Sequence, residues 1–85
     1  MNNKQETPSW FTGSTYSEGS VVLNPFSGDT YELNAVELSM YDFIMGCQHM
    51  WAMGIEPSAG TLDEFERSLK WFTKNNIKAY MALLD

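Results

Sequence analysis

The 85-residue chain lacks long apolar runs, has a single cysteine and carries only five basic residues. One cysteine excludes an internal disulfide bond. No signal-peptide pattern is present, and no apolar run reaches the roughly 18 residues that a membrane-spanning helix needs. These absences predict a soluble cytoplasmic protein without a membrane partner.

Motifs that carry chemistry are also missing. The glycines follow no phosphate-loop pattern, and Asp29 and Glu32 lack the alternating acidic spacing of a calcium loop. Cys47 and His49 are the only residues of their kinds. Two residues this close on a helix point about 200° apart, so they form neither a nucleophile pair nor a zinc site. We therefore expect no enzyme activity, no metal and no cofactor. We expect Cys47 to be buried and inert.

The chain is nevertheless 44% hydrophobic and 14% aromatic, enough for one domain with a thin core. The polar residues 1–9, with Pro8, predict a flexible arm, and residues 10–85 predict a single domain. Residues 10–13, Trp-Phe-Thr-Gly, suit either a short strand or an aromatic lid. The sequence does not decide between the two.

Residues 20–33 have the pattern of a β-hairpin. Pro25 sets φ for a turn, and Gly28 can adopt a positive φ at the return. Tyr31 and Leu33 would then share one face of the second strand, opposite Thr30 and Glu32. A lone hairpin is marginally stable, so it has to pack on helices or on a second subunit.

Three helical patterns follow the hairpin, and they predict an α+β fold. The first covers residues 35–53, with Asn34 and Glu37 as a capping box and Gly54 as a stop signal. The second covers 62–75, with Thr61 and Glu64 as another capping box. The left-handed conformation that asparagine tolerates would break it at residues 75–76. A short helix over 77–84 follows, with one apolar side consisting of Ile77, Tyr80, Met81 and Leu84.

The helix predicted over 35–53 is apolar on two sides. Its wide stripe contains Val36, Met40, Phe43, Ile44, Cys47, Met50 and Trp51. Its narrow stripe contains Leu38, Tyr41, Met45 and Ala52. Either the chain's own hairpin or later helix covers the narrow stripe, or a second copy does so in a twofold homodimer. The candidate interface residues are Leu38, Tyr41, Met45, His49 and Trp51.

Charge is unevenly distributed along the chain. Residues 1–66 hold ten acidic residues against one lysine, a balance of −9, whereas residues 67–85 hold four basic residues against one aspartate, a balance of +3. The acidic balance disfavours nucleic-acid binding. Asp63 and Glu66 precede Arg67 and Lys70 by four residues, which favours intrahelical ion pairs and a solvated basic face. Without a basic groove beside them, the tryptophans are expected in the core or at an interface.

Four segments carry a resemblance to a known group of proteins. Residues 24–28 (NPFSG) and 33–42 (LNAVELSMYD), with Trp71-Phe72 and the ending 75–85 (NNIKAYMALLD), resemble small uncharacterised proteins of tailed, especially marine, bacteriophages. The resemblance implies no active site and no ligand. It favours an accessory viral protein made in the cytoplasm of a bacterial host.

These features together predict a non-enzymatic protein-interaction protein that self-associates, most simply as a dimer. One alternative is a small-ligand or enzyme pocket between subunits around His49, Asp42 and a tyrosine. Another is an acidic inhibitor that imitates nucleic acid, which requires carboxylates aligned in rows on one surface.

Overall fold

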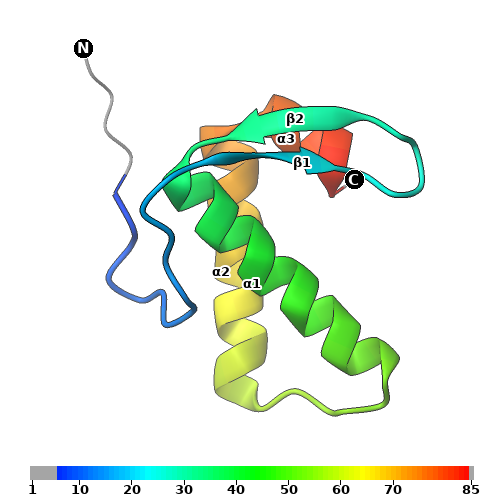
Figure 1. Cartoon of the computed structure of the whole chain (residues 1–85). Coiled ribbons are helices and arrows are strands. Elements are labelled where there is room, and N and C mark those ends of the chain that lie inside the picture. The colour runs from blue at the N-terminus through cyan, green and yellow to red at the C-terminus, as the bar shows by residue number, and fades with distance from the viewer. Residues whose placement is uncertain (1–5, 85) are drawn as a thin grey trace.

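The computed structural model describes residues 6–84 and confirms the α+β fold. A two-stranded antiparallel hairpin precedes two main helices and a short third helix (Figure 1). The elements are β1 (Ser20–Leu23), β2 (Thr30–Leu33), α1 (Ala35–Ala52), α2 (Ala59–Asn75) and α3 (Ile77–Leu83). The hairpin lies across one end of the α1–α2 pair, and the connection between these helices closes the opposite end (Figure 1).

The second strand of the hairpin has the predicted faces. Val22 pairs with Tyr31 and Ser20 pairs with Leu33, so the alternation places Leu33 in the core. Thr30 and Glu32 are exposed on the other face. Gly28 has a φ of 80°, which confirms the predicted return of the turn, because side chains with a Cβ rarely adopt that conformation.

Helix α1 begins as predicted and ends one residue earlier, at Ala52. The Asn34 side chain accepts a hydrogen bond from the Glu37 N–H at 2.8 Å, and a Glu37 oxygen accepts one from the Asn34 N–H at 3.0 Å. This is the predicted capping box. The helix stops where Gly54 takes a φ of 87°.

Helix α2 begins three residues before the predicted start. Ser58 is its N-cap and accepts a hydrogen bond from the Thr61 N–H at 3.1 Å, so the predicted Thr61–Glu64 capping box is not the helix start. Glu64 instead binds Thr12, far away in the sequence. The local pattern was ambiguous because serine and threonine cap helices almost equally well.

The break between α2 and α3 is as predicted, but its cause differs. Asn76 has a φ of −156°, and no residue other than glycine within 6–84 has a positive φ. Asn76 caps α3 instead, accepting a hydrogen bond from the Ala79 N–H at 3.2 Å. Helix α3 ends at Leu83, one residue before the predicted end.

The predicted apolar side of α3 is wrong for two residues. Ile77 and Met81 are exposed, and the buried residues are Ala79 and Leu83. Helix α3 is apolar at most of its seven positions, so periodicity alone cannot select its buried face. Its packing against β2 and α2 decides which face is buried.

The core lies where the hairpin, α1, α2 and α3 meet. The side chains with no exposed surface there include Leu33, Met40, Ile44 and Phe72. Met50, which belongs to the wide stripe on α1, is 42% exposed. At the end away from the hairpin, α1 packs only against α2. The wide stripe is therefore buried or half-buried as far as Cys47 and is exposed at Met50.

The segment before the hairpin is a lid, because no strand forms at residues 10–13. Phe11 is buried and packs edge to face on Phe43, with ring centroids 5.5 Å apart. A turn closed by a hydrogen bond from the Phe11 N–H to the Pro8 carbonyl oxygen precedes it. Of the arm predicted over 1–9, residues 1–5 lie outside the described part of the chain.

Candidate functional site

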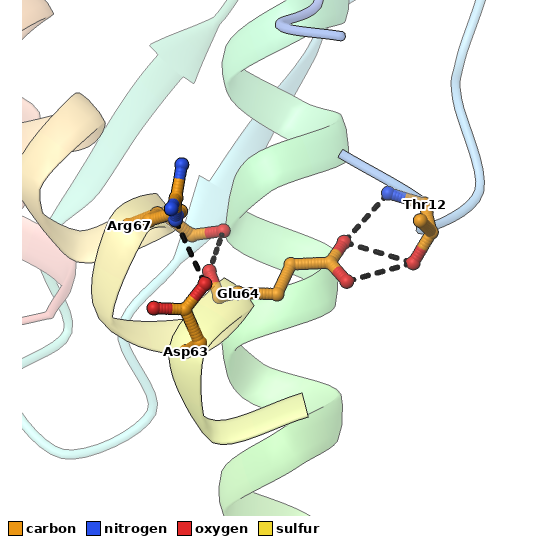
Figure 2. Close-up of polar contacts among 5 residues, drawn as sticks. Thr12, Asp63, Glu64 and Arg67 are labelled. Carbon is orange, nitrogen blue, oxygen red and sulfur yellow. Dashed lines mark hydrogen bonds and ion pairs between the residues drawn. The ribbon is translucent and has the colours of Figure 1, made fainter. Parts of the chain in front are cut away.

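A carboxylate clamp fixes the lid to α2. Glu64 accepts a hydrogen bond from the Thr12 N–H at 2.6 Å and another from the Thr12 hydroxyl at 2.7 Å (Figure 2). Next to it, Asp63 and Arg67 form the predicted ion pair, with 2.8 Å between Nε and Oδ2. The clamp joins residues 52 positions apart and holds the lid against α2 two residues after Trp10.

A buried polar network joins the starts of α1 and α3. Glu37, which is buried, accepts a hydrogen bond from the Asn76 side-chain amide at 3.0 Å. Asn76 Oδ1 accepts hydrogen bonds from the Ala79 N–H and, at 3.4 Å, from the Tyr31 hydroxyl. Sequence reasoning assigned Asn76 only to a helix break. Its position before a short helix was the available signal for a capping role.

An uncharged groove, which we call the tip groove, lies between the hairpin loop and two helices. It has a volume of about 490 Å³. Its lining consists of residues 24–27 of the loop, Tyr41, Met45 and Gln48 of α1, and Leu83 and Leu84 at the end of α3. None of these residues is charged. Phe26, at the tip of the hairpin, is 96% exposed.

Asn24 fixes the loop beside the groove. Its side-chain oxygen accepts a hydrogen bond from the Phe26 N–H at 2.9 Å, an Asx turn, and its amide donates to the Ala82 carbonyl at 3.0 Å. The second bond ties the hairpin tip to the end of α3. The groove wall is therefore held from both sides, and Phe26 is presented on a constrained turn.

The five candidate interface residues do not share one surface. Tyr41 and Met45 line the tip groove, and His49 is exposed one turn further along α1. Leu38 is half-buried against the core. Trp51 lies on the other side of α1, where its ring packs on Phe65 of α2 with centroids 4.6 Å apart. Sequence reasoning missed Phe26, although an apolar residue in a turn was a visible signal.

Of the groups of the alternative enzyme pocket, Asp42 contacts a tyrosine, but His49 does not lie beside Asp42. Asp42 is exposed, and its charge, with its hydrogen bond to the phenol, raises the pKa of Tyr16. His49 is exposed two turns away on α1. Within residues 6–84, no three His, Cys, Asp or Glu side chains are placed to hold a metal ion. No helix in the same part of the chain is long and apolar enough to cross a membrane.

Four of the carboxylates are engaged in contacts within the chain. Glu37 binds Asn76, Asp42 binds Tyr16, Asp63 binds Arg67 and Glu64 binds Thr12. A nucleic-acid mimic needs its carboxylates free and in rows. These contacts therefore give no support to that alternative.

Cys47 is a free, buried thiol, as expected. Burial, and secondarily the charge of Glu64, raises the pKa of Cys47, so little reactive thiolate is present at neutral pH. We expect a thiol reagent to modify the native protein only through opening of the fold, far more slowly than in urea. As a control, the double variant Cys47→Ser, Glu56→Cys gives the rate at which the reagent modifies an exposed thiol in the same protein. Equal native rates for the two chains would contradict this prediction.

Comparison of the chain with protein-family models, curated proteins and solved structures finds no match.

Proposed function

We propose that this protein is a small, non-enzymatic interaction module that forms a twofold homodimer through its tip groove. The observation that carries the proposal is that an exposed aromatic side chain and an apolar groove lie side by side on one face. Phe26 is almost fully exposed, and the apolar groove beside it contains Tyr41, Met45 and Leu84. A twofold axis brings the same patch of two copies together, so each Phe26 can enter the groove of the other copy.

Charge does not oppose self-association at this face. The chain has a net charge of −6, so two copies repel one another at long range. The lining of the tip groove contains no carboxylate. When two copies meet at the tip groove, the lining residues therefore bring no like charges together. Salt at 0.15 M screens the charges elsewhere on the two copies beyond about 8 Å.

Area limits the expected affinity. Reciprocal burial of two phenylalanines removes roughly 300–500 Å² from water. Stable interfaces bury about 1,200–2,000 Å², so the groove walls and rim must supply most of the remainder. We therefore expect a dimer with a dissociation constant in the micromolar range. An accessory role of this kind fits the resemblance to phage proteins.

Sedimentation equilibrium from about 1 to 500 μM tests the proposal. We expect the wild-type mass to rise from 9.7 kDa towards twice that value. Phe26→Ser should raise the dimer dissociation constant about 30-fold or more, because a central aromatic anchor contributes at least about 2 kcal/mol.

Met53→Ser is the matched control. Met53 is also exposed, at 60%, but it lies beyond the end of α1 that is far from the hairpin. This variant should dimerise like the wild type. A wild-type species of 9.7 kDa at every concentration would refute the dimer. Dissociation by Met53→Ser but not by Phe26→Ser would assign the contact to the opposite end of the molecule.

A further inference from the structure

A second groove, on a different face, combines cations with indole rings. It lies along α2, has a volume of about 370 Å³ and is lined by Trp10, Arg67, Lys70, Trp71, Lys74 and Asn75. We call it the indole groove. From the sequence, we expect no basic groove beside the tryptophans. For Trp10 and Trp71 this expectation is wrong, because Arg67, Lys70 and Lys74 line the same groove.

Two of its cations are free to bind an anion. Arg67 is paired with Asp63. The predicted pair between Glu66 and Lys70 does not form, and neither Lys70 nor Lys74 has an ion pair among residues 6–84. The two lysines are four residues apart, so they lie one above the other on α2. Their ammonium groups can approach the same anion.

The lid places the first indole. Trp10 directly precedes Phe11, which is buried, and two residues later Thr12 is clamped by Glu64. The second indole, Trp71, is held by its own helix and packs edge to face on Phe72. Both rings are thus positioned before any ligand arrives, which lowers the entropic cost of binding.

We propose that the indole groove binds a nucleoside phosphate, either as a free nucleotide or as part of a short single strand. A base stacks on an indole, and its phosphate pairs with the two lysines. The groove volume lies at the small end of ligand sites, which suits one nucleotide. An acidic peptide would satisfy the lysines but offers no flat ring to the indoles.

The indole N–H signals in a proton–nitrogen NMR spectrum give a direct test at 50 mM salt. AMP and the single strand dT6 should shift the signals of Trp10 and Trp71. The signal of Trp51 is an internal control, since that ring packs on Phe65. With two phosphate contacts, one for each free lysine, affinity for dT6 should fall about 7-fold between 50 and 200 mM salt.

Charge variants test the lysines against a matched control. Lys70→Gln with Lys74→Gln should weaken AMP binding about tenfold. Lys78→Gln removes an exposed cation from α3, outside the groove, and should change binding less than twofold. If dT6 binds more tightly than AMP, the ligand is a strand, and equal binding identifies a free nucleotide.

Two results would overturn the proposal. One is the absence of shifts at Trp10 and Trp71 with millimolar AMP and dT6. The other is tighter binding of a hexaglutamate peptide than of dT6, which would assign the groove to an acidic protein segment. Because Phe26 does not line this groove, the Phe26→Ser chain should bind AMP normally, so this test is independent of the dimer.

Discussion

Replacing Phe72 with alanine is expected to lower the free energy of unfolding by about 3–5 kcal/mol. Phe72 has no exposed surface and is the largest fully buried side chain among residues 6–84. It lies on α2 in the cluster formed with Leu33, Met40 and Ile44. Alanine would lose the transfer free energy of the ring and leave a cavity that the surrounding elements fill only partly.

An effect of this size is severe for so small a domain. A total stability of about 4–12 kcal/mol is ordinary for this length. Thermal unfolding followed by circular dichroism should show a midpoint at least about 12 °C lower. Phe26→Ala makes the same chemical change at an exposed position and should leave the midpoint almost unchanged at concentrations where the chain is monomeric. Similar losses for both variants would contradict the assignment of Phe72 to the core.

Replacing Asn76 with alanine is expected to cost about 2–4 kcal/mol. Loss of the N-cap of α3 accounts for about 1 kcal/mol. The buried Glu37 carboxylate also loses the donor that reaches it at 3.0 Å, and a buried charged group left short of a partner costs about 1–3 kcal/mol. Urea unfolding monitored by tryptophan fluorescence measures the difference.

The variant Asn76→Asp separates the two roles of this residue. Aspartate caps a helix as well as asparagine does. It cannot donate to Glu37, however, and it places a second negative charge beside it. We therefore expect Asn76→Asp to be at least as unstable as Asn76→Ala. Stability within about 0.5 kcal/mol of the wild type would show that the contact with Glu37 contributes little.

The buried face of β2 and the start of α1 could be predicted because their causes are local. Alternation along β2 determines the face of Leu33, and the capping box spans only three residues, from Asn34 to Glu37. The start of α2 could not be predicted in the same way. Glu64 suits a local capping box, but it binds Thr12, and only the folded chain brings Thr12 within reach.

The candidate site was predicted in part for a similar reason. Tyr41 and Met45 belong to the narrow stripe, which the helical period makes visible. Phe26 lies in a turn, where no period applies, and its exposure follows from the placement of the hairpin loop, which Asn24 fixes to Ala82 of α3. Trp51 was included as an aromatic residue, but Phe65 of α2 covers one side of its ring.

The sequence by itself determined the number and order of the elements, the hairpin turn at Gly28 and the cap of α1. Each follows from hydrogen bonds and side-chain periods within about ten residues. Only the tertiary structure decided which face of α3 is buried, where Glu64 and Asn76 bind, and that Trp10 lies beside Lys70 and Lys74. Those outcomes depend on contacts between distant segments, which form only when the whole chain minimises its exposed apolar surface.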